Sequence, residues 1–480
     1  MTRRNGSAPG VPCPALRFSR LLFRGWTGRL GLAALSVVLV TGLSSGSARA
    51  QDGAGAEDSG RAAAEPARED AAMGPAFAEG DVLTLDQVER LKPYLPEEFW
   101  SNREFFFYEG MQLEIGPFHA DYSPNETFDA ATRKYSDQVR IGPDNSRENY
   151  VAGRAFPNDE IDCLGDPQAG VKIMWNFMQD GNSGSASFYY SYWDRGEKLP
   201  LYYEGSGRTV GLAHRVEPQY ESTNADMFRG EKRKRASGVE VIAPFDARGI
   251  ALLTYRYKSS DLPRAEARND DTWVYVPSLR RVRRISTAQR TDSISGTDFT
   301  MDDLRSFNGV VPQYEWTCLA ERELMAPMNT KVKGYPYDKE HNFGPYGLSF
   351  ADDRWELRRA YLVRMVPKND DHPYHHKDIW VDTETYAPLY SFAYDQKEEL
   401  WKIIWHAKRF SRDESLTGNW FPGWKGNPDP RGLVVVADII VNTQTGTGNR
   451  IEFWDAHGTP LKSKGKVRRY IDVGRLTRGR

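Results

Sequence analysis

The residue types best suited to metal chemistry lie close together late in the chain. They are Asp371, His372, His375, His376 and Asp378, and His and Asp side chains commonly bind metal ions. The same segment also contains Pro373 and further acidic residues, which is typical of a polar hairpin loop in water. We favour the loop, because the surrounding sequence offers no framework of hydrogen-bonding groups to orient metal ligands. The sequence therefore assigns no metal site.

Motifs of catalysis are missing outside the N-terminal region. The G-x-S-x-G match from Gly42 to Gly46 lies in a segment interpreted below as a leader, and neither H-E-x-x-H nor a phosphate-binding G-x-x-x-x-G-K-[ST] loop occurs. Neighbouring carboxylates such as Asp302 and Asp303 would point to opposite faces of a strand. We assign no catalytic residue and no cofactor. A secreted hydrolase with dispersed catalytic residues, with the loop around His375 as its best starting point, stays as an alternative.

A run of arginines is the most unusual polar feature of the chain. Arg280, Arg281, Arg283 and Arg284 occupy what should be a strand, so Arg281 and Arg283 share one face and the other two share the opposite face. If one pair faced the interior, carboxylates or an anionic ligand would have to satisfy it. An exposed sheet edge, whose charges discourage aggregation, is an equally good interpretation.

These side chains must be positioned by β-strands, because period-2 alternation of apolar and polar residues dominates the chain from about residue 100. The alternating stretches predict antiparallel strands with one dry and one wet face; they lie at 254–258, 273–276, 355–365 and 390–394. The β-branched run 433–441 predicts a central strand. One short helix is predicted before them, with Thr84 as N-cap, Leu85, Val88 and Leu91 on one face, and Pro93 as its end.

The N-terminus predicts export. Six arginines and no acidic residue precede the apolar run from Leu30 to Leu43, and Ala48-Arg49-Ala50 offers a cleavage site, so residues 1–50 are interpreted as a signal peptide for the periplasm. Residues 51–80 have too few bulky apolar side chains to fold and are expected to be a flexible linker. Residues 81–480 are expected to form a single β-rich domain.

Charge and cysteine content narrow the function further. Removing residues 1–50 takes away seven arginines and no acid, so the net charge falls from −2 to −9, and an acidic chain is a poor general binder of nucleic acid. Cys163 and Cys318 are the cysteines that remain. In an oxidising compartment they can pair, and two separate buried thiols are as consistent with the sequence.

Several segments resemble a known family. They include 150–157 (YVAGRAFP), 271–285 (DTWVYVPSLRRVRRI), 296–298 (GTD), 355–361 (WELRRAY) and 379–382 (IWVD). In order and spacing they are similar to the domain of unknown function 1329 family, proteins of the outer-membrane lipoprotein-sorting type, over roughly residues 81–410. The resemblance implies a mainly β fold, a large curved antiparallel sheet forming a LolA/LolB-like half-open barrel with a few short helices. It also implies a partner among envelope export pumps of the resistance-nodulation type.

An aromatic half-open barrel suits an apolar ligand without any covalent step. The leading hypothesis is therefore a periplasmic carrier of a lipid or other hydrophobic molecule, and a non-catalytic envelope adaptor is a further alternative. The candidate ligand-binding residues, each of which also fits an ordinary core position, are Trp273, Tyr275, Arg281, Arg283, Trp355, Leu357, Tyr361, Phe392 and Tyr394.

Overall fold

A single long sheet organises the residues that the computed structural model describes. These are residues 76–178, 184–193, 201–285, 290–331, 343–410, 433–457, 461 and 463–478, and all of them belong to the unit Ser47–Arg480. The expected leader, and the expected linker up to residue 75, lie outside the described residues. At the end of the expected linker, Phe77 is buried against Tyr94 and Phe118.

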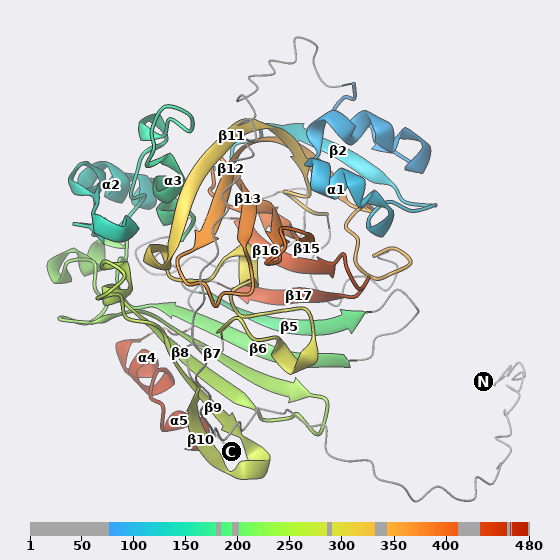
Figure 1. The fold of residues 1–480 in the computed structure, drawn as a ribbon. Coiled ribbons are helices and arrows are strands. Elements are labelled where there is room, and N and C mark those ends of the chain that lie inside the picture. Colours follow the sequence, from blue (N-terminus) through green and yellow to red (C-terminus); the bar gives the residue numbers. More distant parts are fainter. Residues whose placement is uncertain are drawn as a thin grey trace, which may run out of the picture. The chain divides into compact units, whose positions relative to one another are not determined.

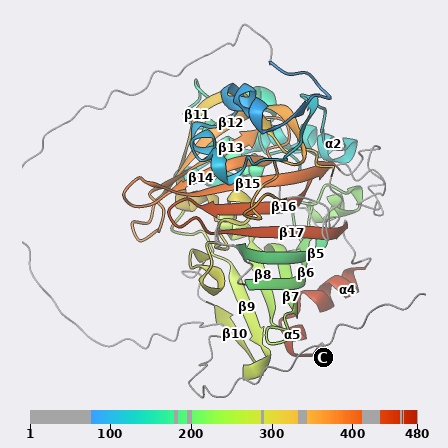
Figure 2. The same ribbon diagram turned by 90° about the vertical axis from the view of Figure 1, so that its right-hand side faces the viewer.

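The sheet has 15 strands in the order β1-β2-β12-β13-β14-β15-β16-β17-β5-β6-β7-β8-β9-β10, with β11 paired to β12 (Figures 1 and 2). Its strands are β1 Val82–Leu83, β2 Leu113–Phe118, β5 Gly184–Trp193, β6 Leu201–Gly211, β7 Arg233–Ala243, β8 Ala251–Tyr257, β9 Asp271–Val276, β10 Arg281–Ile285, β11 Tyr314–Ala326, β12 Arg354–Pro367, β13 His376–Asp382, β14 Pro388–Tyr394, β15 Leu400–Phe410, β16 Leu433–Asn442 and β17 Gly448–His457. A separate small sheet pairs β3 Arg140–Ile141 with β4 Arg147–Glu148.

The predicted fold class is confirmed, with one correction. The structure is mainly β, its large sheet bends strongly at β11 and β12 (Figure 1), and its helices are short. The sheet is mixed rather than wholly antiparallel, because β2 runs parallel to β12. It is also open, since β1 and β10 are the two ends of the strand order among the described residues.

Each alternating stretch of the sequence forms a strand. The stretch 254–258 falls largely on β8, 273–276 on β9, 355–365 on β12 and 390–394 on β14. The β-branched run forms β16, which is central as predicted, between β15 and β17.

Short helices accompany the sheet. They are α1 Glu97–Ser101, α2 Glu126–Tyr135, α3 Ala169–Phe177, α4 Lys464–Tyr470 and α5 Arg475–Arg478. The helix predicted after Thr84 is a 3-10 helix, Leu85–Tyr94, with a capping box between Thr84 and Gln87. Its predicted apolar face is correct, because Val88 and Leu91 are buried.

The two faces of the central strands are covered by different parts of the chain. On β15, Ile403, Trp405 and Ala407 belong to the apolar cluster that includes the helical segment 85–107, which we call the N-terminal cover. On the opposite face, Lys402 and His406 contact residues 303 and 306. These belong to the connection between β10 and β11, described over residues 290–313, which we call the crossing segment.

A disulfide attaches a third part of the chain, the loop before α3, to the sheet. Cys163, in the loop before α3, is bonded to Cys318 of β11. Helix α3 then packs its apolar side chains, including Ile173 and Trp175, with Trp316 of β11 and Val363 of β12 in a second apolar cluster. The sequence left open whether these two cysteines pair, and the structure shows that they do.

Candidate functional site

The largest apolar cluster lies between the sheet and the N-terminal cover. Strands β12, β14, β15 and β16 supply one wall, and the cover and the segment 343–351 supply the other. Three of the predicted ligand-binding residues, Trp355, Leu357 and Phe392, lie in it with exposed fractions of 2% or less. We call this cluster the apolar interior.

Two phenylalanines of the cover fill the centre of the apolar interior. The rings of Phe99 and Phe106 stack with centroids 4.1 Å apart, and both are fully buried. Phe99 lies edge-on to Trp405 and Tyr390 at 5.1 Å, and Trp355 lies 5.7 Å from Trp405. The cover therefore occupies the space that an apolar ligand on this wall would take.

The apolar interior contains one unsatisfied polar group among these aromatic rings. The indole nitrogen of Trp405 is buried and has no hydrogen-bond partner among the described residues. The equivalent groups of its neighbours are satisfied, because Trp355 Nε1 donates to the Phe350 carbonyl at 2.8 Å and the Tyr390 hydroxyl donates to the Met325 carbonyl at 2.6 Å. A buried unpaired N–H group is costly, so Trp405 offers a donor to any molecule that enters.

Polar contacts fasten the rim of the N-terminal cover. The hydroxyl of Tyr394, another predicted site residue, donates to Glu98 Oε1 at 2.8 Å. Arg322 Nη2 donates to the Leu95 carbonyl at 2.7 Å. These contacts connect the cover to β14 and β11, so both must break for the cover to lift from these strands.

The structure does not bring the remaining predicted site residues into the apolar interior. Tyr361 lies in the α3 cluster with Val363 and Met365, although the sequence pattern put it on one face with Trp355 and Leu357. The reason is that β12 is 14 residues long and different parts of the chain cover its two ends: Trp355 and Leu357 pack with the N-terminal cover, whereas Tyr361 packs with α3.

The other four predicted residues lie at the far end of the sheet. Trp273 and Tyr275 of β9 belong to a third apolar cluster, with α4 and α5. Arg281 and Arg283 are exposed on β10, the last strand in the sheet order. Of the two interpretations of the arginine run, the structure agrees with the exposed sheet edge.

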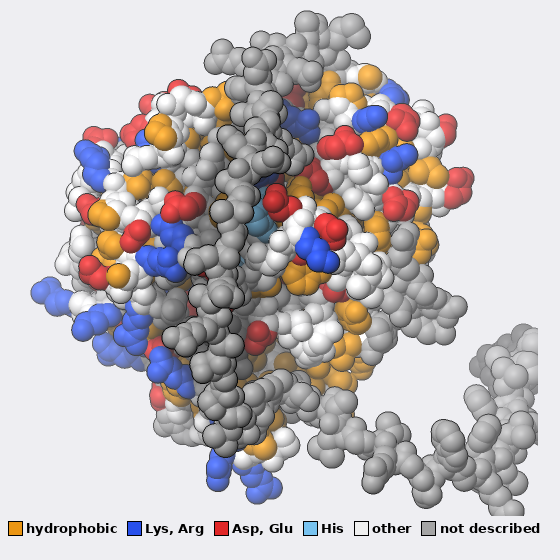
Figure 3. Space-filling model, viewed as in Figure 1, with side chains coloured by type: hydrophobic (Ala, Val, Ile, Leu, Met, Phe, Trp, Pro, Cys, Tyr) orange, Lys and Arg blue, Asp and Glu red, His pale blue; other side chains and the backbone are white. Residues whose placement is uncertain are grey.

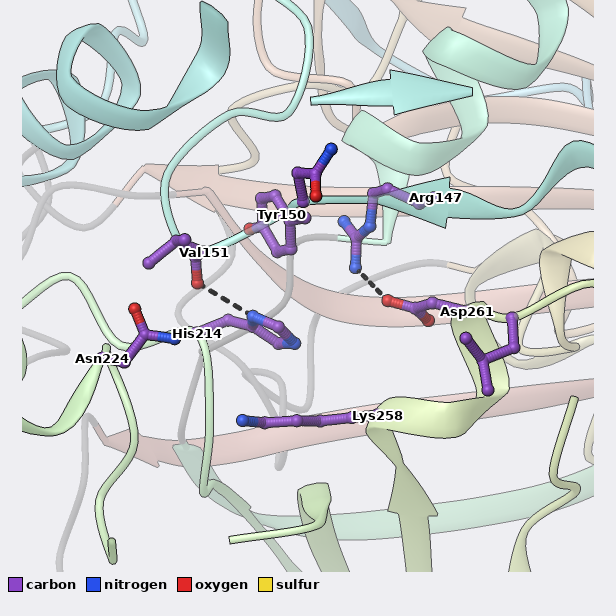
Figure 4. Close-up of a pocket in the computed structure, with 9 residues that line it drawn as sticks. Arg147, Tyr150, Val151, His214, Asn224, Lys258 and Asp261 are labelled. Carbon is purple, nitrogen blue, oxygen red and sulfur yellow. Dashed lines mark hydrogen bonds and ion pairs between the residues drawn. The ribbon is translucent and has the colours of Figure 1, made fainter. Parts of the chain in front are cut away.

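A polar pocket of about 170 Å³ lies elsewhere, where the segment after β4 meets the loops that follow β6 and β8 (Figure 4). Arg147 enters it between the rings of Tyr150 and Trp175, at 3.6 and 4.4 Å from their centroids. Its guanidinium donates to Asp261 at 2.7 Å. Lys258 borders the same space.

Several residues at this polar pocket have left-handed backbone. Asn149, His214 and Asn224 line it with φ values of 59°, 59° and 54°, and the adjacent Ala225 has φ 61°. Asn and His adopt left-handed backbone more readily than most residues, whereas for Ala225 it is unfavourable and persists because surrounding contacts impose it. With its Arg, Lys and Asn donors the pocket suits a small anionic or polyhydroxylated group, and its volume is too small for a long acyl chain.

Comparison with known proteins decides the family. The family described as "protein of unknown function (DUF1329)" matches residues 87–423. The chain belongs to the DUF1329 family. The predicted resemblance over residues 81–410 is therefore confirmed.

Relatives of this DUF1329 chain are distant. An uncharacterized protein of Pseudomonas aeruginosa is 23% identical over 299 residues, which cover 60% of each chain, so the match spans about three-fifths of that relative. A DUF1329 protein from Desulfovibrio piger is similar in structure, with 18% identity, 65% of this chain and 99% of that chain covered, and a TM-score of 0.42. A LolA superfamily protein from Nitrosomonas europaea is 13% identical, with 57% and 86% covered and a TM-score of 0.31.

In this DUF1329 chain, a serine of the crossing segment forms a hydrogen-bonded group with a histidine and an aspartate of the sheet, which the sequence did not reveal. Ser306 Oγ lies 2.7 Å from His406 Nε2, and His406 Nδ1 lies 2.5 Å from Asp438 Oδ1. These are the partners of a serine hydrolase triad, but their exposed fractions are 0%, 0% and 1%. With no access for a substrate, the contacts fasten the crossing segment to β15 and β16. Three separate elements supply them, so no spacing in the sequence could signal them.

The histidine cluster is divided between a loop and a strand in the structure. His376 begins β13 and stacks on Tyr394 at 4.1 Å, whereas Asp378 is held by two 2.7 Å bonds from Arg364. No group of three His, Cys, Asp or Glu residues within the described ranges is arranged to hold a metal ion.

Proposed function

We propose that this protein binds and carries a hydrophobic molecule in the apolar interior, between the sheet and the N-terminal cover. The observation that carries the proposal is the aromatic wall of Trp355, Tyr390 and Trp405, closed by Phe99 and Phe106 of the cover. An apolar ligand that replaced the cover on this wall would bury surface at about 25 cal/mol per Å². The free energy needed to lift the cover from the wall is then comparable to the free energy gained when the ligand takes its place. A reversible carrier requires this balance.

The ligand chemistry follows from Trp405. Its unpaired Nε1 donor favours a molecule that is mainly apolar but carries one hydrogen-bond acceptor near its middle or end, such as a fatty acyl ester or a sterol. A pure alkane would leave this donor unsatisfied. We therefore expect the site to prefer acyl esters and sterols over hydrocarbons of equal size.

We infer that the carrier works in the periplasm after export. The Cys163–Cys318 disulfide supports this inference, because disulfides persist mainly in oxidising compartments. No helix in the described ranges is long and apolar enough to cross a membrane. An envelope export pump, which the family resemblance implies, is the partner that we propose for loading or unloading.

The test begins with the chain from Gln51 onward, purified from a periplasmic extract without detergent and examined by native mass spectrometry with lipid identification. We expect a stoichiometric lipid, or stoichiometric uptake of a fluorescent acyl ester by the delipidated protein. A protein that is empty and takes up no apolar probe contradicts the carrier and favours an adaptor role.

Two substitutions locate the site within that assay. Trp405→Phe keeps an aromatic ring but removes the donor, so affinity for the acyl ester should fall several-fold while affinity for an alkane probe stays the same. Tyr394→Phe removes the bond to Glu98, so the probe should enter several-fold faster. Trp175→Phe and Tyr361→Phe, matched changes in the α3 cluster, should alter neither property. Equal effects from all four variants would place the ligand elsewhere.

A further inference from the structure

The end of the sheet farthest from the N-terminal cover in the strand order displays apolar side chains to solvent. Phe245 is 89% exposed, and Ile242 and Leu279 are 52% and 50% exposed. Phe245 lies in the turn between β7 and β8, and Leu279 lies in the turn between β9 and β10. Exposed apolar residues are common singly, but a group at one edge usually marks an interaction site.

The two turns lie at the same end of their strands. β8 is antiparallel to both β7 and β9, and its first residue, Ala251, pairs with Glu240 near the end of β7 and with Tyr275 near the end of β9. The turn carrying Phe245 and the turn carrying Leu279 therefore project together (Figures 1 and 2). We call the residues 242–248 and 277–283 the hairpin tips.

The first hairpin tip is rigidly supported from behind. Ala247 and Ile250 are buried against Val274 in a small apolar cluster. Backbone bonds also close the turn, with the Ala247 amide donating to the Pro244 carbonyl at 3.2 Å and the Ile250 amide donating to the Ala247 carbonyl at 3.1 Å. Phe245 is thus held outward by a packed base, and its exposure is part of the fold.

Basic side chains surround the hairpin tips. Arg248, Arg280, Arg281 and Arg283 are all exposed, and the exposed acids near them among the described residues are Asp246 and Glu240. Basic side chains also show at the lower end of the molecule in Figure 3, where Figure 1 places β9 and β10. This local excess of positive charge stands out in a chain whose net charge is −2.

We propose that the hairpin tips dock the protein onto the surface of an anionic lipid bilayer. An aromatic ring and two aliphatic side chains can enter the interface between headgroups and acyl chains, while the arginines remain at the level of the phosphates. Two narrow projecting turns suit insertion into a fluid surface better than the broad flat contact of a protein interface. Docking stands independently of whether the apolar interior holds a cargo, and it would bring such a carrier to its membrane.

The experiment is co-sedimentation of the chain from Gln51 onward with large vesicles, either of phosphatidylcholine alone or with one-third phosphatidylglycerol. We expect binding to the anionic vesicles, weakened by added salt, and much less binding to the neutral ones. Phe245→Ser should weaken binding roughly tenfold, and Arg280→Gln with Arg281→Gln should weaken it by roughly fivefold for each charge removed.

Matched controls separate docking from general surface effects. Leu164→Ser removes an aliphatic side chain that is 48% exposed elsewhere, and Arg229→Gln removes an exposed arginine before β7; both should bind as the unchanged protein does. Phe245 is almost fully exposed, so its replacement should leave the melting temperature unchanged. A protein that fails to bind anionic vesicles, or hairpin-tip variants that bind as well as the controls, would overturn the proposal.

Discussion

Lys408 places an ammonium group where water does not reach. Its exposed fraction is 1%, and its Nζ has no hydrogen-bond partner among the described residues. Burial lowers the pKa of the Lys408 ammonium to about 7, although the carboxylates of Asp438 and Asp382 oppose this shift. Burying such a group without a hydrogen bond lowers the free energy of unfolding, so it destabilises the folded state.

Replacing this lysine should stabilise the protein. Lys408→Met keeps an unbranched apolar chain of similar length and removes the buried ammonium, so the free energy of unfolding at pH 7 should rise by roughly 1–3 kcal/mol. Chemical denaturation measures the change. Lys397→Met, at an exposed position in the β14–β15 turn, should change it by less than about 0.5 kcal/mol. A less stable Lys408→Met variant would mean that the ammonium makes a stabilising contact after all.

The same substitution should also change how the free energy of unfolding depends on pH. Because the folded pKa of Lys408 lies below that of the unfolded chain, the folded state binds fewer protons between about pH 7 and pH 10.5. Stability of the unchanged protein should therefore rise across that window through this residue, and the rise should be smaller in Lys408→Met. Identical pH profiles would show that Lys408 does not titrate there.

At the scale of elements, the crossing segment is held to the sheet by buried charge. Asp303 is at the centre, with Lys377 Nζ at 2.6 Å and Lys402 Nζ at 3.2 Å from its two carboxylate oxygens. The Tyr374 hydroxyl also donates to it, at 2.8 Å. Although burial opposes ionisation, Lys377 and Lys402 hold the pKa of Asp303 well below its usual range.

Neutralising this carboxylate should be strongly destabilising. Asp303→Asn leaves two buried ammonium groups without their counter-ion, and losing one member of a buried ion pair typically costs about 3–5 kcal/mol. Chemical denaturation at neutral pH measures the loss. The folded pKa is depressed, so the stabilisation by Asp303 should be complete above pH 4 and should diminish as the pH falls below it.

Asp298 provides a control within the same segment. Its carboxylate accepts bonds from two neutral groups, Asn442 Nδ2 at 2.7 Å and Thr447 Oγ1 at 2.6 Å. Asp298→Asn should therefore cost only about 1 kcal/mol. If both variants lose equal stability, the ion pairs do not hold the crossing segment.

Strands were predictable in this chain because their alternation is local, whereas the covers depend on contacts distant in sequence. Tyr255, Tyr275 and Phe392 were correctly placed on strands by period-2 alternation alone. The stacking of Phe99 with Phe106 opposite Trp405 joins residues about 300 positions apart, and nothing in the local pattern around Phe99 indicates it. The cluster that Tyr361 joins was not predictable for a related reason: it depends on which distant part of the chain covers each end of the 14-residue strand β12.

For the whole molecule, the two covers of the sheet are held by different forces. The N-terminal cover is attached mainly by aromatic packing, with a few hydrogen bonds at its rim, such as Tyr394 to Glu98. The crossing segment is attached by buried ion pairs through Asp303 and by Ser306 to His406. Under the proposed function, a ligand would displace the first cover alone and leave the ion pairs of the second undisturbed.

Hydrogen exchange should therefore show two levels of opening. Amides of residues 85–107 should exchange through an opening of lower free energy than those of β13–β16 and the crossing segment, because local opening is easiest where few hydrogen bonds and no buried ion pairs must break. Tyr394→Phe should lower the opening free energy of the cover by about 1 kcal/mol and leave exchange in residues 290–313 unchanged. Mass spectrometry of peptides from both segments provides the measurement. If the two covers and the sheet exchange together, in one cooperative step, the cover does not open separately and a cargo could reach the aromatic wall only through global unfolding, which is incompatible with a carrier.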